Sequence, residues 1–341
     1  MKTMSKKEFR IGSKWIGRGS PCFIIAEAGS NHNGDLTTAK KLIATAARIG
    51  ADAIKFQLFK GEELSAESKI QEILKRYEFK RKWLGILNDF SEEKGIIFFA
   101  TPFDEKAVDE LTLIDVPVFK IASGDLTNFP LIEYIASKKK PIILSVGVGT
   151  LKEINESLKI IYQKGNHGVS LLHCVADYPT RIEDVNLRVI ETLKSQFKIP
   201  VGFSDHTMDT TIPALAVSQG ACIIEKHFTL SRRLKGPDHP FALEPEEFRT
   251  MVENIRKTEK ALGTPIKGMT PTERGVLKTG RRSLYAKRFI PRGMMIQKED
   301  IAILRPNQGI PPSDLNKVIG KMAKRNISLF EAIKWKDLDG K

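Results

Sequence analysis

The chain has 341 residues, of which 41% are hydrophobic and 28% are charged, and its formal net charge at pH 7 is +14. That length accommodates one large domain and a small second one, and the hydrophobic share is ordinary for a globular protein. The sequence contains no apolar run of membrane-spanning length, and the charged segment Met1–Arg10 lacks a signal-peptide core, so we expect a cytoplasmic protein without a membrane partner.

The first predicted element is a small β-hairpin over Phe9–Gly19, part of an N-terminal extension that covers residues 1–22. From residue 23 to residue 263, apolar runs rich in Ile, Val and Phe alternate with amphipathic helical stretches. The runs predict eight strands, at Phe23–Gly29, Ala53–Phe59, Ile96–Phe103, Val118–Gly124, Pro141–Gly147, Val169–Pro179, Val201–Thr207 and Ile223–Thr229.

The stretches between and after these runs predict helices. We expect them near Leu36–Ile49 and Lys80–Lys94, from Asp104, through Ile132, through Ile154, through Val189, over Asp209–Gln219 and over Glu246–Leu262. Strand–helix units repeated over about 240 residues fit a (β/α)₈ TIM barrel, and near-continuous apolar strands suit a sheet buried on both faces. A doubly wound open sheet is the alternative, but polar residues end every run here, which favours the barrel.

The pattern changes after residue 263. Residues 264–282 have the composition of a linker, and residues 283–341 predict a small, irregular, β-rich domain. The segment Thr264–Lys341 contains 17 Lys and Arg against 7 Asp and Glu, yet it has no nucleic-acid-binding signature. We therefore expect no nucleic-acid partner, and attribute the charge to solubility or to an anionic small substrate.

The cysteines Cys22, Cys174 and Cys222 lie at or within apolar runs, with a spacing that matches no zinc motif. We expect buried free thiols.

Two histidines stand at matching ends of the last two predicted strands. His206 ends the run Val201–Thr207, and His227 ends the run Ile223–Thr229. Because neighbouring strands lie about 4.8 Å apart, the two imidazoles are predicted to lie side by side. Neutral imidazoles bind divalent transition metals, so we predict a metal site here. The alternative is a pair of polar residues that cap buried strands.

Lysines and hydroxyls end other strands. Lys55 and Lys120 inside a barrel mouth require an anion, and with Ser123, Ser145 and Ser204 they would suit a phosphate and a carboxylate. One alternative pairs the lysines with Glu27, Glu225 or Asp125. Another gives Lys120 the role of a Schiff-base lysine, as in a class I aldolase, although a metal would duplicate that role.

Glu27 and Arg305 are two further candidate residues. Glu27 ends the first strand and is predicted to act in catalysis or in substrate contact; the alternative is a turn that caps the next helix, which Asn33 and Asp35 could form alone. Arg305, in the C-terminal part, could bind a carboxylate through its guanidinium fork, or could be an ordinary surface arginine.

The motifs together resemble the sialic acid synthase family, which includes N-acetylneuraminate, legionaminate and pseudaminate synthases. The matching stretches are IIAEAGSNHNGD, ADAIKFQ, ATPFD, FKIASGDLTN, ILSVG, LLHCVADYP, VGFSDHT, IEKHFTL and KGPDH. The stretches SLYAKRFIPRG and LRPNQGI resemble that family's antifreeze-like (SAF) domain. The resemblance extends from Phe23 to Lys341.

This resemblance implies a metal-dependent condensation of phosphoenolpyruvate with an open-chain N-acylated hexosamine of the N-acetylmannosamine type. The products would be a nine-carbon 2-oxo sugar acid and phosphate. It implies that His206 and His227 hold manganese, with magnesium or cobalt as alternatives, and that Glu27 lies near the sugar aldehyde and the metal-bound water. The phosphoenolpyruvate residues would be Lys55, Gln57, Thr101, Lys120, Ser123, Ser145 and Ser204. The sugar residues would be Asp125, Tyr178, Asp238 and Arg305, the last reaching across a domain-swapped homodimer.

One position departs from the family pattern. Many members have a hydroxyl or amide side chain after His-Cys in the sixth strand, where this chain has Val175-Ala176. Ala176 cannot donate a hydrogen bond, which leaves open a diacetamido-trideoxyhexose, the acceptor of legionaminate and pseudaminate synthases. A non-enzymatic alternative makes the C-terminal domain an ice- or surface-binding module.

Overall fold

A computed structural model of the chain describes residues 8–17 and 19–339. Most of the segment Met1–Arg10, on which the signal-peptide prediction rests, lies outside these residues. The chain divides into two compact units, one up to Gly263 and the other from Thr264 onward. Within the described ranges, no helix is both long and apolar enough to cross a membrane.

The predicted apolar runs form the strands of the first unit. Within the described residues, eight parallel strands make one sheet: β3 (Phe23–Gly29), β4 (Ala53–Leu58), β5 (Ile97–Pro102), β6 (Phe119–Ile121), β7 (Ile142–Ser145), β8 (Val169–Cys174), β9 (Val201–Asp205) and β10 (Ile223–His227). Neighbours in the chain are neighbours in the sheet, and β3 pairs with β10. The ends of the order, β5 and β6, also touch, so the sheet closes on itself. The predicted barrel is confirmed, because an open doubly wound sheet would reverse its strand order at a switch point.

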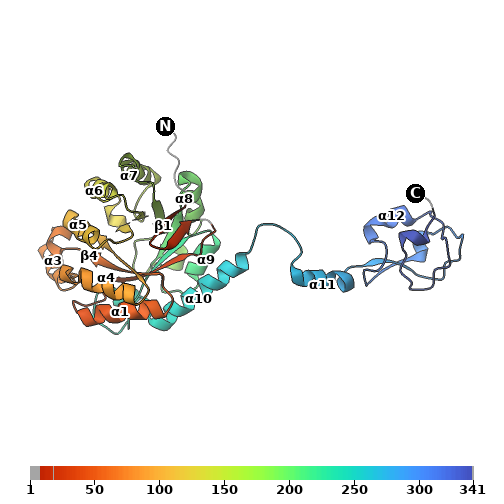
Figure 1. Cartoon of the computed structure of the whole chain (residues 1–341), viewed down its shortest axis with the longest axis horizontal. Helices are drawn as coiled ribbons and strands as arrows, with labels where there is room; N and C mark the ends of the chain where they lie inside the picture. The colour runs from red at the N-terminus through yellow and green to blue at the C-terminus, as the bar shows by residue number, and fades with distance from the viewer. Residues whose placement is uncertain (1–7, 18, 340–341) are drawn as a thin grey trace. The chain divides into compact units, whose positions relative to one another are not determined.

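Helices surround these strands (Figure 1). They are α1 (Leu36–Arg48), α2 (Gly61–Leu64), α3 (Ser68–Lys75), α4 (Leu84–Glu93), α5 (Glu105–Leu113), α6 (Phe129–Ser137), α7 (Leu151–Gln163), α8 (Val189–Phe197), α9 (Ile212–Ser218) and α10 (Pro245–Leu262). Local caps set where several of them begin. Asp35 accepts from the backbone N–H of Thr38 at 2.7 Å and caps α1. Glu27 therefore has no capping role.

The helices after β6, β7 and β8 end later than predicted. The sequence predicted helices through Ile132, Ile154 and Val189, whereas α6, α7 and α8 extend to Ser137, Gln163 and Phe197. The intervening residues form loops at the ends of the strands. Thr150 shows how such a start is fixed, since its side chain accepts from Glu153 N while Glu153 reaches back to Thr150 N.

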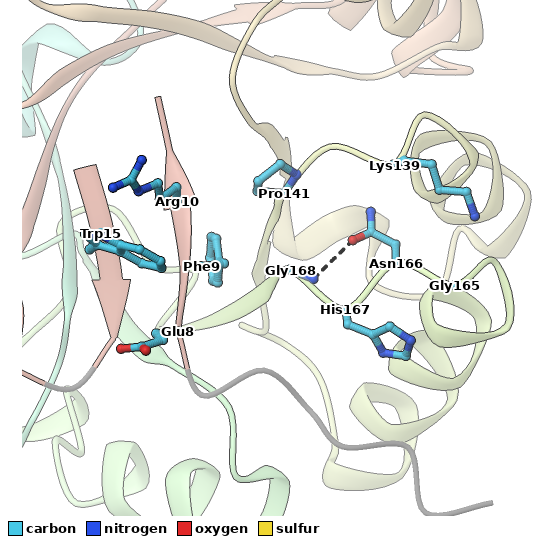
Figure 2. A pocket seen from close by; sticks show the side chains of 10 residues that line it. All are labelled: Glu8, Phe9, Arg10, Trp15, Lys139, Pro141, Gly165, Asn166, His167 and Gly168. Atoms are coloured by element: carbon cyan, nitrogen blue, oxygen red, sulfur yellow. Dashed lines mark hydrogen bonds between the residues drawn. The ribbon is translucent and has the colours of Figure 1, made fainter. Parts of the chain in front are cut away.

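The predicted N-terminal hairpin forms, with β1 (Glu8–Ile11) antiparallel to β2 (Lys14–Gly17). Its buried residues Phe9, Ile11 and Ile16 join the barrel core. A cavity of about 640 Å³ opens between this hairpin and the loops that lead into β7 and β8, with Trp15 and His167 among its lining (Figure 2). It lies at the N-terminal ends of the strands and includes none of the predicted site residues, as expected for the end of a barrel that contributes stability.

The second unit is irregular, as predicted. It contains α11 (Pro271–Gly280), β11 (Ser283–Ala286), β12 (Ile301–Leu304) and α12 (Leu315–Val318), with β11 antiparallel to β12. Its own small core is built from aliphatic side chains such as Leu284, Ile290 and Ile333. Helix α11 lies in the segment predicted as a linker. A capping box of Thr270 and Glu273 starts it, and the spacing Thr-x-x-Glu was the signal that could have revealed it.

A buried histidine packs in an aromatic cluster of the barrel. The ring centroid of His32 lies 6.0 Å from Phe56, 5.5 Å from Phe79 and 5.8 Å from Trp83. Its Nδ1 accepts a hydrogen bond from the backbone N–H of Gly34 at 2.9 Å. Burial disfavours an imidazolium here and outweighs the charge of Asp35, which favours it, so the neutral ring is the form that fits.

This burial predicts acid sensitivity. Burial, followed by the charge of Lys80, lowers the pKa of His32 to about 4 from its usual 6.5. Between about pH 6.5 and pH 4, His32 therefore binds a proton in the unfolded chain and stays neutral in the folded chain. The free energy of unfolding falls as the pH drops through this window. We expect a loss of roughly 3 kcal/mol over this window from His32 alone, because one pKa unit corresponds to about 1.36 kcal/mol.

The check is a pH series of unfolding free energy for the native chain and for His32→Asn, whose amide oxygen can still accept from Gly34. The variant should be less stable at pH 7 and show a shallower fall toward pH 4. Parallel slopes for the two proteins would contradict a neutral buried His32.

Candidate active site

The polar residues at the C-terminal ends of the strands converge because side chains alternate along each strand. In β10, Glu225 and His227 share one face, and Lys226 points to the other. Strand pairing sets Glu225 beside Ser204 and His227 beside Glu27. Glu27 in turn pairs with Lys55 of β4. These strands thus bring carboxylates, a lysine and a histidine to one mouth of the barrel.

Two buried lysines share a carboxylate at this mouth. Lys55 forms an ion pair with Glu27 and lies with its Nζ 3.7 Å from Glu225 Oε2. Lys120 Nζ lies 4.0 Å from the other oxygen, Glu225 Oε1. Lys55 and Lys120 are 3% and 2% exposed, so both charges are removed from bulk water. The pairing of lysines with Glu27 and Glu225, one of the alternatives drawn from the sequence, describes these contacts; Asp125 instead accepts from Asn128 at 3.0 Å.

Burial and the neighbouring charges shift the pKa values of these lysines and carboxyl groups in opposite directions. Burial alone would raise the pKa of Glu225, but the charges of Lys120 and Lys55 outweigh it and lower that pKa. Burial would lower the pKa of Lys55, but Glu225 and Glu27 raise it, whereas burial prevails at Lys120 and lowers its pKa. At Glu27 burial prevails over the charge of Lys55 and raises the pKa to about 7. The site therefore keeps a paired carboxylate at Glu225 and a carboxyl at Glu27 that can gain or lose a proton near neutral pH.

Hydroxyl groups surround the lysines. Lys55 Nζ donates to Thr101 Oγ1 at 3.1 Å, and Lys120 Nζ donates to Ser145 Oγ at 2.6 Å. Ser204 Oγ donates to Glu225 Oε1 at 3.1 Å. These contacts place Thr101 and Ser145 against the two ammonium groups, and Ser204 against the carboxylate that lies between them.

The other two predicted phosphoenolpyruvate residues lie at the edge of this group. Ser123 follows β6, where it contacts Cys174 Sγ at 2.9 Å and accepts from the backbone N–H of Gly147 at 3.1 Å. Gln57, half-buried in β4, pairs in register with Thr101. Both belong to strand ends at the same mouth.

The two histidines lie side by side. Their ring centroids are 5.5 Å apart, with planes at 63°. His206 Nδ1 lies 2.7 Å from the carbonyl oxygen of Val175, which assigns its N–H to that nitrogen and leaves the Nε2 lone pair toward the site. Burial, reinforced at His227 by the neighbouring His206, lowers both imidazole pKa values, which favours the neutral, ligating form.

The imidazole pair offers donor atoms for a metal ion. Among the described residues, no group of three or more His, Cys, Asp or Glu side chains has the arrangement of a metal site. The fit rests instead on the imidazole pair and on His227 Nδ1, a buried atom that finds no hydrogen-bond partner in the described part of the chain. Such orphaned buried atoms require an explanation. Two imidazoles would leave several positions open, as a catalytic metal requires.

An aromatic and acidic wall stands beside the imidazoles. Tyr178 packs on His206 with ring centroids 4.1 Å apart, and Phe241 packs on His227 at 4.9 Å. Asp238 Oδ2 lies 3.9 Å from His227 Nδ1 and accepts from Ser30 Oγ at 3.5 Å. Tyr178 is 48% exposed, so this wall borders the opening of the site.

Gly29 makes room for Asp238. Its φ is +49°, and a Cβ added there would lie 2.6 Å from Asp238 Oδ2. A side chain at this position would push the carboxylate away from His227.

Three further residues named from the sequence are half-buried or exposed. Asp125 is half-buried in the loop after β6, and Ala176 is exposed in the loop after β8. Arg305 is exposed in the second unit, where its relation to the barrel mouth stays a prediction. Glu225 is not among the predicted site residues, although alternation along β10 places it on the same face as His227. The structure sets it between the two lysines.

The arrangement can bind a small anion with two ammonium groups and hydroxyls, next to an imidazole pair and a carboxyl of raised pKa. One end of a substrate would be held by charge, and the other would contact the wall of Tyr178 and Asp238. This is a suitable environment for joining an anionic substrate to a polar one by acid–base chemistry.

Comparisons with known proteins give a consistent picture. A model described as the NeuB family matches residues 42–267, and one described as the SAF domain matches residues 281–339. An uncharacterized protein of Methanocaldococcus jannaschii is 45% identical over 98% of this chain and 99% of its own length. N,N'-diacetyllegionaminic acid synthase of Legionella pneumophila is 39% identical over 96% of this chain and 98% of its own.

A solved structure is also similar. It is the N-acetylneuraminic acid (sialic acid) synthetase of Leptospira borgpetersenii in complex with citrate. Its sequence is 41% identical, its TM-score is 0.76, and the match covers 79% of this chain and 95% of that one.

Proposed function

The chain belongs to the NeuB family of sugar-acid synthases, and we propose that it condenses phosphoenolpyruvate with an open-chain N-acylated hexosamine. The products would be a nine-carbon 2-oxo sugar acid and phosphate. The observation that most strongly supports this proposal is the buried pair Lys55 and Lys120, bridged by Glu225 at the mouth that also holds the two imidazoles. A substrate with a phosphate and a carboxylate needs such cationic partners in a site removed from water.

In this proposal the lysines and hydroxyls bind phosphoenolpyruvate. Lys120 and Ser145 hold one anionic group, and Lys55 with Thr101 holds the other. Ser123, Ser204 and Gln57 complete the contacts. The negative charge of the substrate replaces part of the charge that Glu225 supplies to the lysines, so the ammonium groups exchange one anionic partner for another with little reorganisation.

His206 and His227 would hold a divalent ion, with manganese as the proposed metal. When bound, such an ion supplies Lewis-acid polarisation of the sugar aldehyde. The chain's own residues orient the rest: Tyr178, Asp238 and Asp125 contact the sugar, and the lysines fix phosphoenolpyruvate so that its C3 faces the aldehyde carbon.

Glu27 would act as the general base for the water that adds to C2 of phosphoenolpyruvate. A pKa near 7 lets its carboxylate accept that proton at neutral pH. Loss of phosphate from the resulting carbon then restores the carbonyl group of the 2-oxo acid.

The acceptor has two candidates. N-acetylmannosamine is the first. A diacetamido-trideoxyhexose is the second, favoured by the similarity to the Legionella legionaminic acid synthase and by Ala176, which offers no hydrogen bond to the acceptor.

The proposal is tested by a phosphate-release screen with phosphoenolpyruvate and each of these acceptors, before and after chelation and after return of Mn²⁺. We expect release with at least one acceptor, loss with EDTA and recovery with Mn²⁺. Release that persists after exhaustive chelation would contradict the metal role, and trapping of pyruvate on Lys120 by borohydride would favour the Schiff-base alternative.

A further prediction concerns Arg305 and the assembly of the chain. We propose a domain-swapped homodimer in which Arg305 of one chain completes the barrel mouth of the other. Replacing Arg305 with alanine should lower kcat/KM by about 10²-fold or more, because a charge-assisted contact to the bound substrate is lost. Light scattering should give a dimer for this variant and for the native chain.

Subunit mixing distinguishes action across the dimer from action within one chain. R305A and Lys120→Met are each expected to be nearly inactive. When they are coexpressed, mixed dimers contain one site with both residues intact, so activity should return to about a quarter of the native level. Coexpressed chains that stay as inactive as either variant alone would place Arg305 in the site of its own chain.

A further inference from the structure

Two cysteines meet where the first and last barrel strands join. Cys22 directly precedes β3, and Cys222 directly precedes β10. The parallel ladder between these strands begins with the pair Phe23 and Ile223, and the backbone N–H of Phe23 donates to the carbonyl oxygen of Cys222 at 3.0 Å. Cys22 and Cys222 thus occupy matched positions one residue before the ladder.

Hydrogen bonds hold both backbones in place. Cys22 N donates to Glu259 Oε1 at 2.5 Å, and its carbonyl oxygen accepts from Arg256 Nη1 at 2.9 Å. Cys222 N donates to the carbonyl oxygen of Val201 at 2.9 Å. The two residues cannot drift apart without breaking contacts to α10 and β9.

Their spacing suits a covalent bond. Neighbouring strands lie about 4.8 Å apart, within the range of roughly 4.4–6.8 Å between the Cα atoms of a disulfide. Matched positions of parallel strands also direct their side chains to the same face. Burial and then the neighbouring Cys222 raise the pKa of the Cys22 thiol well above its usual value, as expected for two thiols in close proximity.

We propose that Cys22 and Cys222 are a redox-modification site and form a reversible disulfide that joins β3 to β10. The oxidant is a small-molecule disulfide such as oxidised glutathione. The thiolate of the half-buried Cys222 attacks it, forms a mixed disulfide and releases one thiolate. The thiolate of Cys22 then attacks the sulfur of Cys222 and releases the second. Two protein thiols are oxidised, and one small disulfide is reduced to two thiols.

The bond would act on stability and leave the chemistry unchanged. Cys22 lies five positions before Glu27, so the bond forms about 17 Å from the mouth, at a rise of about 3.3 Å per residue. It would close a loop of about 200 residues and restrict the unfolded chain strongly. Cys174 differs, because it contacts Ser123 at 2.9 Å and its modification would disturb the site itself.

The test treats the full-length folded protein with oxidised glutathione for a prolonged period at alkaline pH, because burial raises the pKa of Cys222 to about 12 and that of Cys22 well above its usual value, so that only a small fraction of thiolate reacts at any time. We expect a mass loss of about 2 Da and one linked peptide pair that contains Cys22 and Cys222. Without reductant, Tm should rise by about 5 °C or more, and dithiothreitol should reverse the rise. Phosphate release should stay within about twofold of the reduced protein.

Cys22→Ala and Cys222→Ala are the matched controls, since each removes one partner and keeps the same fold and oxidant. Neither should show the linked peptide or the reversible Tm rise. The proposal is overturned if Cys222 keeps a stable glutathione adduct in the native chain. Unreacted thiols after prolonged treatment, or the same Tm rise in Cys22→Ala, would overturn it too. The outcome is independent of the proposed synthase activity, because mass and Tm need no substrate.

Discussion

Replacing Lys120 with methionine is expected to lower kcat/KM for phosphoenolpyruvate by about 10²–10³-fold, the loss typical when one preorganised contact to an oxyanion is removed from a dry site. Lys120 is 2% exposed and donates to Ser145 Oγ at 2.6 Å. Methionine fills similar space and carries no charge, so the anionic substrate would lose one of its two ammonium partners. Steady-state phosphate release over a range of phosphoenolpyruvate concentrations measures the effect.

The fold should survive this change. Burial lowers the pKa of Lys120, which means that the charged ammonium group destabilises the folded chain. Removing that charge should therefore lower the Tm of Lys120→Met by no more than a few degrees. Lys226→Met is the contrasting variant, because Lys226 is equally buried but pairs with Asp205 on the other face of β10. Breaking that ion pair should cost about 3–5 kcal/mol of unfolding free energy, with turnover per folded molecule retained in the cold. Activity of Lys120→Met within tenfold of the native chain would remove Lys120 from the substrate site.

Replacing His206 with asparagine is expected to remove the metal ion and to reduce activity by about 10³-fold, because Lewis-acid polarisation contributes several kcal/mol. The substitution is chosen for its shape. The asparagine amide occupies the place of Nδ1 and can keep the hydrogen bond to Val175, while Nε2, the proposed ligand atom, is deleted. Metal content per chain after dialysis and phosphate release together give the result.

His173→Gln serves as the control for this change. His173 Nε2 contacts the carbonyl oxygen of Val185 at 2.8 Å, and a glutamine amide can replace that contact. This variant should retain both the ion and most of the activity. Full metal occupancy in His206→Asn would show that other residues hold the ion.

The barrel was predictable because its strands are apolar along their whole length, which only a sheet covered on both faces requires. The predicted ends of the helices after β6, β7 and β8 were too early for a physical reason. A strand end at the mouth of a barrel is followed by a loop whose length depends on the site, so the helix starts at a capping residue such as Asn128 or Thr150 and has no fixed distance from the strand. The Thr-x-x-Glu spacing was visible in the sequence at Thr150 and again at Thr270.

The site was predictable where alternation along a strand decides it. Spacing along β10 placed Glu225 and His227 on one face, and pairing with β9 brought Ser204 beside Glu225. The network of ion pairs was harder to predict from the sequence, because the distance between Lys120 and Glu225 depends on how the barrel closes. The half-buried state of Cys222 was also missed, where a buried thiol was expected. Arg305 belongs to the second unit, and its place at the mouth is the prediction that the subunit-mixing experiment tests.

Strand β10 carries opposite charges at adjacent positions, and this has a consequence for how the barrel closes. Glu225 meets lysines in the interior, while Lys226 meets Asp205 in the layer beneath the helices. A slip of one residue in one direction would place Lys226 against Lys55, and a slip in the other direction would place Glu225 against Asp205. Either slip would bring two like charges together. Repulsion between like charges thus disfavours every other register of the final strand. A single insertion or deletion in this strand should therefore prevent folding even where hydrophobicity is preserved.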